Sequence, residues 1–530
     1  MIQNSMDLDK SITRLPADTL GADLIWWRSS HGWSTNVTLF WSRFQQFADT
    51  IHLQALLFDR AGQCVATWRI GLPAAHPILI DSTAPGPWQG HGDGMLALYA
   101  CTDGPPSEAA RKKFHRLYPL VGWHGPLGEI ASLHSDQVIR RGRDKVQAIT
   151  EIVAIENDTE RNALVILNGE EHQEPGALAL TFTNADGERM DGSYMEAMSP
   201  FEVHRIALRE IAPGLGEFAR GQPFTVSGRF ESHGLFTRPY VETTGARYGI
   251  YHAGDVYAWA PLPHFVHALV DGEVNPMAVV HDGSTRTIVN LLHSHGDLED
   301  DVAVDARLYD LQGRCIAQRP SWQLARRHGL SRADVADLLP DPSQPFRGHI
   351  ALSFRPLPGQ PVPRRLQALL EYRADASIAH VMAWSDEWNS AVRLARRDRR
   401  DHPALLQSYF RVVERTDCAT GISITNAGHP GYARSAQIAL ELHGPQGLIA
   451  KTSFELAPYA TRMAPVLEIF PNAREQLSPG GIGLLIASSE SDLANVAFTR
   501  SSASGALAAE HFLPLQALGE DGRWLVAAGR

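Results

Sequence analysis

The turn FDRAG at residues 58–62 decides the fold, because similar turns recur three times along the chain. The later copies are TNADG at 183–187, YDLQG at 309–313 and HGPQG at 443–447. Their closing glycines lie 125, 126 and 134 residues apart. Alternating apolar residues precede each turn, as Leu53, Ala55 and Leu57 do in the first copy, and this alternation is typical of a half-buried strand. Each copy is therefore predicted to form a β-hairpin whose glycine has a positive φ.

A polar corner forms a second landmark in the same register. It reads SLHSDQ at 132–137, YHAGDVY at 251–257 and AWSDEW at 383–388, with AEHFLP at 509–514 as a degenerate fourth copy. Asp136, Asp255 and Asp386 follow their own turn glycines by 74, 68 and 73 residues. Two landmarks in register indicate four tandem copies of a unit of roughly 130 residues.

The predicted fold class is all-β, with four tandem β-sandwich modules and short connecting helices. The modules are placed at residues 1–145, 146–270, 271–400 and 401–530. Residues 105–118 and 330–340 are the two helix candidates. We expect the modules to form a rod or a curved array.

Composition limits the functional classes. A net charge of −11 over 530 residues argues against nucleic acid as a partner, because binding to phosphates needs a basic face. Four scattered cysteines indicate a reducing compartment, and Cys64 and Cys315 on the return strands are expected to pack in the core. The acidic N-terminal segment does not read as an export signal, and no apolar run is long enough for a membrane span. The expected location is the cytoplasm.

The module pattern resembles that of the sensory rhodopsin transducer family, a small β-sandwich. The shared features are an Asn-containing first strand (ISITN, 422–426), an alternating strand, a turn, and a strand that ends in Leu-x-Pro (LAP, 456–458). A closing strand with His and Asp near its end, as in SLHSDQ, completes the resemblance. It implies a sandwich in which carbohydrate or partner binding has been suspected.

The polar-richest segment, residues 231–259, lies in the second module. It holds the ligand-binding candidates His233, Arg238, Tyr240, His252, Asp255 and Tyr257. Arg suits a carboxylate or phosphate, Tyr stacks on a sugar or ring, and His and Asp hydrogen-bond polar groups. The alternative is a hydrogen-bonded corner that fixes module packing. Trp384, Asp386 and Trp388 form the corresponding corner of the third module and are further candidates.

Metal binding is a second hypothesis, since 23 histidines are present and some have ligand-like spacing. The candidate ligands are His252 with Asp255, and His293 with His295, which share one face if their segment is a strand. Solvent-exposed loop histidines are the alternative. The cofactor otherwise stays unknown.

The preferred function is a non-catalytic scaffold that recognises a glycan, a small metabolite or a protein partner, because no nucleophile motif is present. The alternatives are a metal- or His/Asp-dependent enzyme acting on a polar, sugar-like substrate at the second module, and a structural assembly protein. Sequence leaves open whether the protein is an enzyme and what its oligomeric state is.

Overall fold

Each of the four sequence copies folds into two antiparallel sheets that share an order of four strands in a computed structural model of the chain. The structure describes residues 2–3, 19–40, 51–71, 76–105, 117–135, 138–139, 145–232, 235–236, 238–256, 276–292, 301–326, 329–355, 365–386, 405–426, 435–477, 480–491, 493–512 and 516–518. The all-β class with four sandwich modules is confirmed. Within the described residues, no helix is both long and apolar enough to cross a membrane.

Modules 1 and 2 contain the first two pairs of sheets. In module 1 the outer sheet has the order β1 (Ile2–Gln3), β5 (Cys64–Gly71), β4 (Ile51–Asp59), β7 (Gly94–Thr102), β2 (Thr19–Trp27), and the inner sheet has the order β6 (Ile78–Asp81), β3 (Ser34–Leu39), β8 (Leu120–His124), β9 (Ile130–His134). In module 2 the outer sheet has the order β14 (Arg189–Tyr194), β13 (Leu178–Thr183), β16 (Phe224–Ser232), β11 (Lys145–Ala154), β20 (Gly254–Val256), and the inner sheet has the order β15 (Val203–Ala207), β12 (Glu160–Leu167), β18 (Tyr240–Gly245), β19 (Gly249–His252). A short pair, β10 (Val138–Ile139) with β17 (Leu235–Phe236), joins the two modules.

Modules 3 and 4 repeat the order of four strands in both sheets, while β1, β20 and β37 are additional edge strands of the outer sheets of modules 1, 2 and 4. In module 3 the outer sheet has the order β21 (Met277–His281), β26 (Phe346–Arg355), β23 (Val302–Asp310), β24 (Cys315–Ala325), and the inner sheet has the order β25 (Leu330–Asp334), β22 (Thr285–Leu292), β27 (Arg365–Ala374), β28 (Ile378–Asp386). In module 4 the outer sheet has the order β32 (Gly447–Leu456), β31 (Ala436–Gly444), β34 (Ile482–Ser489), β29 (Leu405–Val413), β37 (Gln516–Leu518), and the inner sheet has the order β33 (Thr461–Pro465), β30 (Cys418–Asn426), β35 (Leu493–Ser501), β36 (Leu507–Phe512). The domain boundaries chosen from the sequence stay a prediction.

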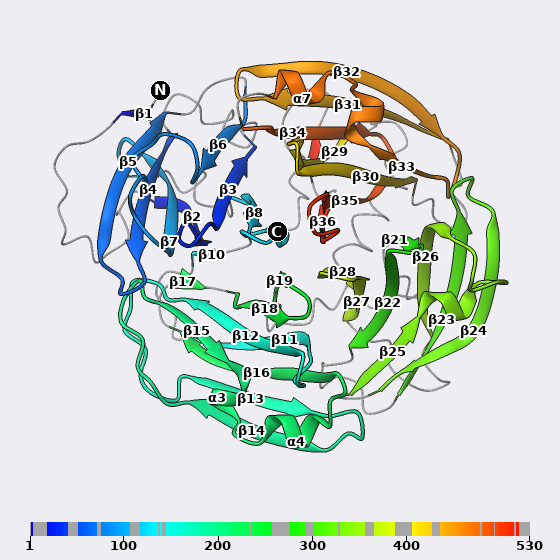
Figure 1. The fold of residues 1–530 in the computed structure, drawn as a ribbon, viewed down its shortest axis with the longest axis horizontal. Helices are drawn as coiled ribbons and strands as arrows, with labels where there is room; N and C mark the ends of the chain where they lie inside the picture. The colour runs from blue at the N-terminus through cyan, green and yellow to red at the C-terminus, as the bar shows by residue number, and fades with distance from the viewer. Residues whose placement is uncertain are drawn as a thin grey trace.

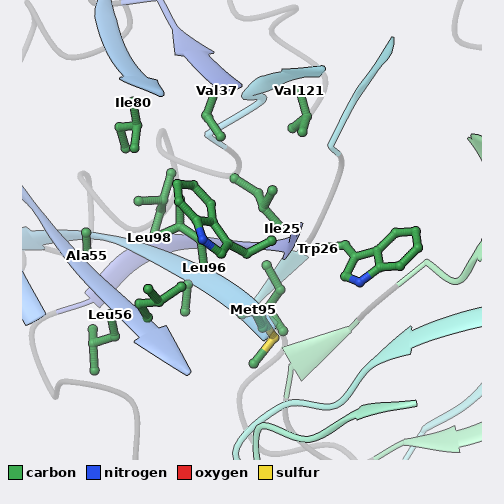
Figure 2. Close-up of a cluster of buried hydrophobic side chains, with 14 of the residues drawn as sticks. Ile25, Trp26, Val37, Ala55, Leu56, Ile80, Met95, Leu96, Leu98 and Val121 are labelled. Atoms are coloured by element: carbon green, nitrogen blue, oxygen red, sulfur yellow. The ribbon is translucent and has the colours of Figure 1, made fainter. Parts of the chain in front are cut away.

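Apolar side chains from both sheets fill each sandwich. In module 1, Val37 and Ile80 of the inner sheet face Leu98 of the outer sheet (Figure 2), and all three are buried. The same cluster continues into module 2 through Val165 and Tyr240. Burial of continuous apolar surface is the main stabilising term for the sandwiches and for their contacts with each other.

The four modules form a curved array that closes into a ring, so the alternative of a rod was wrong. Figure 1 shows them in chain order around a centre, with module 4 beside module 1. Phe40 and Leu120 of module 1 belong to the apolar cluster of module 4, and Ser504 of module 4 donates a hydrogen bond to the carbonyl of Gly128 in module 1. Every module therefore has two neighbours.

The recurring turn has the predicted conformation. Gly62, Gly187 and Gly313 have φ of 76°, 82° and 81°. The Asp59 carboxylate at the start of the first turn accepts hydrogen bonds from the backbone N–H groups of Ala61 and Gln63. Asn184 and Asp310 cap the second and third turns in the same way.

Two of these turns are also contacts between modules. Phe58 stacks on Phe201 of module 2 with ring centroids 4.2 Å apart, and Tyr309 stacks on Tyr459 of module 4 at 5.2 Å. The Gly62 backbone lies so close to module 2 that a Cβ built there would be 2.3 Å from the Pro200 carbonyl oxygen. The turn of module 2 differs, because a Cβ on Gly187 would meet nothing within 4 Å.

The substitution Gly62→Ala is therefore expected to destabilise the protein more than Gly187→Ala, although both place alanine at a similar positive φ. The shared backbone strain costs about 1 kcal/mol, and the clash with module 2 adds about 1–3 kcal/mol for Gly62→Ala only. Urea denaturation of the two variants measures the difference. Equal losses of unfolding free energy in the two variants would show that the contact of the Gly62 turn with module 2 does not stabilise the protein.

Two local expectations were wrong. Residues 330–340 form β25 and a 3-10 helix, η1 (Val335–Leu338), because Leu330 and Arg332 pair with β22 and the Asp334 side chain caps the short helix. Cys315 is exposed, since β24 is a sheet edge with few buried positions, whereas Cys64 is buried as expected. The other candidate helix falls mainly on residues 106–116, outside the described residues.

Among the described residues, the short α-helices lie within modules 2 and 4. They are α3 (Leu208–Ile211), α4 (Leu215–Ala219), α6 (Val466–Ile469) and α7 (Ala473–Gln476). Each pair connects the two sheets of its own sandwich, from β15 to β16 in module 2 and from β33 to β34 in module 4. Modules 2 and 4 thus resemble each other in this connection.

Candidate functional site

The last strand of each inner sheet lies at the centre of the ring. These inner strands, β9, β19, β28 and β36, surround the centre in Figure 1. Strand β9 contacts β19 and β36, and β28 contacts the same two strands from the opposite side. Residues more than 370 positions apart, such as Ser132 and Glu510, are in contact there.

The strand registers identify one equivalent position on all four inner strands. In each module a polar side chain accepts a hydrogen bond from the backbone N–H seven residues before it, at Thr35, Asn162, Thr287 and Thr420. These four residues pair across the sheet with Trp123, Thr243, Tyr372 and Thr499. Those four partners pair in turn, in the same order, with Ala131, Gly249, Ala379 and Ala508 on the inner strands. Three residues further on lie His134, His252, Met382 and His511. We call these four residues the axial corner residues.

The three axial histidines form a compact buried cluster. Their exposed fractions are 4% for His134, 7% for His252 and 8% for His511. The His134 ring centroid lies 5.0 Å from that of His252 and 5.0 Å from that of His511. One ring nitrogen from each lies within 4.8 Å of the other two, so three imidazoles from three modules can reach one ion.

The cluster lines a small cavity of about 20 Å³. Its lining residues come from all four modules and are Ser132, Leu133, His134, Tyr251, His252, Leu369, His380, Met382, Ala509, Glu510 and His511. That volume holds one water molecule or one ion, since a single water needs at least ~10–15 Å³ on this measure. It does not hold a sugar.

Burial keeps His511 in the neutral protonation state that a metal requires. The pKa of His511 is lowered to about 3, chiefly because burial penalises the charged ring, and also by nearby His252 and Arg238. His252 Nδ1 lies 3.1 Å from the Ala253 carbonyl oxygen, which can only accept a hydrogen bond. Nδ1 therefore carries the proton and Nε2 carries the lone pair, the arrangement found in many metal-binding histidines.

A fourth histidine, His380, also lines the cavity and lies in β28. It precedes Met382 by two residues, and its Nε2 is 3.7 Å from the buried carboxylate of Glu371. Burial lowers the pKa of His380, and Glu371 partly opposes that effect. Glu371 also forms ion pairs with Arg332 and Arg373. His380 is thus part of a structural network in module 3.

The contact between modules 4 and 1 beside the cavity contains buried charge. The Arg411 guanidinium of β29 donates to Asn36 Oδ1 of module 1 and is 2% exposed. It occupies space that a side chain on Gly122 would fill, because a Cβ there would be 2.2 Å from Arg411 Cζ. Ser132 Oγ donates to Glu510 Oε2 over 2.8 Å, and burial raises the pKa of Glu510 to about 7.

The ligand candidates from the sequence fall into three groups: those whose side chains the structure describes, those of which only the backbone is described, and those outside the described residues. The first group is His252, Arg238 and Tyr240. His252 belongs to the axial cluster, and Arg238 is half-buried and close enough to His511 to affect its pKa. Tyr240 is buried, and its hydroxyl donates to the Leu24 carbonyl oxygen of module 1 over 3.1 Å, as in a corner that fixes module packing.

The remaining candidates give less information. Asp255 lies in β20 and pairs with Ile149, while Trp384 and Asp386 lie in β28, and only their backbones are described. The other five fall outside the described residues, and these are His233, Tyr257, Trp388, His293 and His295.

The sequence candidates did not include His134, His511 or Met382. The first two lie in polar corners that the sequence does reveal, namely SLHSDQ and AEHFLP. Their meeting with His252 depends on closure of the ring, which no local pattern indicates. Met382 has no sequence signal of its own, since a methionine on a strand usually fills a core.

Comparisons with known proteins add little. A scan against protein-family models and a search of curated proteins find no match. Among solved structures, the chain is similar to a tetra-tandem repeat in the extending region of a large adhesion protein. The identity is 11%, with 87% of this chain and 90% of that chain covered and a TM-score of 0.10, which is too low to support any argument. The resemblance to the sensory rhodopsin transducer family stays a prediction.

Proposed function

We propose that the protein is a non-catalytic, ring-shaped scaffold in which one transition-metal ion joins modules 1, 2 and 4 at the centre. The observation that carries this proposal is the meeting of three buried imidazoles, from modules 1, 2 and 4, within 4.8 Å of one another. Neutral imidazole is a preferred ligand of zinc, copper, nickel and iron in proteins. An ion at this position links modules that are far apart in the chain.

The burial of the cluster supports a structural ion over a catalytic one. A catalytic metal keeps a coordination position open to water and substrate, whereas a structural metal is enclosed by protein ligands. The axial histidines are buried, and the cavity beside them has about 20 Å³. An enzyme that acts on a sugar at His252 would need a much larger cavity.

Recognition of a glycan, small metabolite or protein is the second part of the proposal. Tyr240 and His252, two of the residues expected to contact a ligand, are buried between modules. A partner approaching from solvent would therefore contact other residues of the ring. A thermal-shift screen of sugars and metabolites on the metal-loaded protein tests small-molecule recognition, which fails if no compound raises the Tm.

The metal is tested first by elemental analysis of the purified protein and by titration of chelator-treated protein with Zn²⁺ and Co²⁺. We expect about one ion per chain and a metal-dependent rise in Tm, because binding to the folded state alone stabilises it. The variants His134→Ala, His252→Ala and His511→Ala should each lose the ion and the rise in Tm.

The variant His349→Gln is the matched control. His349 is also fully buried, but it lies in β26 away from the cluster. Its replacement should lower the Tm of the metal-free protein and leave the bound metal and the metal-dependent rise intact. A wild-type chain that binds no metal, or equal metal binding in His252→Ala, would rule the proposal out.

A further inference from the structure

Met382 occupies the fourth axial corner. The strand registers that align His134, His252 and His511 place Met382 at the same level on β28. The side chain is 5% exposed and lines the cavity with the histidines. Three imidazoles and one methionine side chain, one from each module, thus line the same cavity.

The charges around the cavity disfavour a divalent ion. None of the four axial corner residues is a carboxylate, and the Arg238 cation interacts electrostatically with His511. Glu510 also lines the cavity, but its carboxyl accepts a hydrogen bond from Ser132 Oγ and does not occupy an axial corner position. With four neutral ligands, a divalent ion such as Zn²⁺ keeps two positive charges near Arg238, whereas a monovalent ion keeps one. The Coulomb repulsion between the ion and Arg238 is therefore halved for a monovalent ion.

We propose that the axial site binds Cu(I), with the three histidine imidazoles and the Met382 thioether as its ligands. This inference rests on the proposed metal site and names its ion. Thioether sulfur is a soft ligand that favours Cu(I), and imidazole binds copper well. A reducing compartment, which the few scattered cysteines indicate, keeps copper in the monovalent state.

The test is anaerobic competition for Cu(I) against the chelator bicinchoninate, with parallel Zn²⁺ titration. The change Met382→Leu keeps volume and apolarity but removes the sulfur, so the sandwich should stay folded. We expect its Cu(I) affinity to fall at least about tenfold while Zn²⁺ affinity changes little, because only the soft ion depends on the thioether. Met277→Leu is the control, since Met277 is buried in the same module but lies in β21.

X-ray absorption at the copper edge gives a second readout. A sulfur neighbour of the copper is expected in the wild type and in Met277→Leu, and its loss in Met382→Leu. Equal Cu(I) affinity in both methionine variants, with Zn²⁺ binding retained, would overturn the copper assignment and leave the histidine site standing. Failure to bind either ion would overturn the metal site itself.

Discussion

Replacement of Arg411 by alanine is expected to lower the free energy of unfolding by about 3–5 kcal/mol, because it removes one partner of a buried set of charges. Arg411 is fully buried between modules 4 and 1, where it bonds Asn36 and interacts electrostatically with Glu510. Burial lowers the Arg411 pKa to about 10, so the side chain stays charged at neutral pH. The variant removes the cation that lowers the pKa of Glu510, and it leaves an empty space beside Gly122.

Arg415 provides the matched control for this contact. Its guanidinium forms an ion pair with Asp81 of module 1 over 3.0 Å, but the Arg415 side chain is 21% exposed. Arg415→Ala should therefore cost only about 1 kcal/mol. Urea denaturation of both variants measures the losses, and similar losses would mean that burial of Arg411 has no special role in closing the ring.

Acidification should destabilise the metal-free protein through His349. This buried histidine stacks on Tyr309 at 4.8 Å, and its Nδ1 is 3.0 Å from Thr461 Oγ1 of module 4. Burial lowers the His349 pKa from 6.5 to about 3. Because the unfolded chain binds the extra proton first, the contribution of His349 is intact above pH 6.5 and is lost as the pH falls toward 3. The free energy of unfolding changes by about 1.4 kcal/mol per pH unit in this range, so the full loss over about 3.5 units is about 5 kcal/mol.

The comparison of wild type with His349→Gln between pH 7 and pH 4 isolates this effect. Glutamine does not titrate, so the stability difference between the two proteins should shrink as the pH falls. Val302→Ala, a core truncation in β23 of the same module, should show a difference that does not vary with pH. A constant difference for His349→Gln as well would contradict the depressed pKa.

The sequence was sufficient to predict the module but not its assembly. Turn glycines such as Gly62 and Gly187 and the alternation before them reflect interactions between residues close in the chain, so they can be read directly. Residues 330–340 have an apolar spacing that also suits a helix, and pairing with β22 decided their structure instead. Tertiary contacts of this kind are absent from a local pattern.

The candidate site shows the same limit more strongly. His252 was identified from its polar surroundings, whereas its partners His134 and His511 lie about 120 and 260 residues away in the chain. The sequence reveals each polar corner separately, but the angle between neighbouring sandwiches determines whether the corners of different modules meet. That angle depends on side-chain packing across the contacts, for example Phe58 on Phe201.

Closure of the ring also constrains how such a protein can change in length. In an open array of repeats, a unit can be gained or lost at an end, because every junction has the same geometry whatever the number of units. Here both junction-forming surfaces of every module are already covered by a neighbour. A fifth module would require all the junction angles to change together. The copy number of four is therefore a property of the contacts, and we expect size variation to occur as insertions in loops rather than as whole modules.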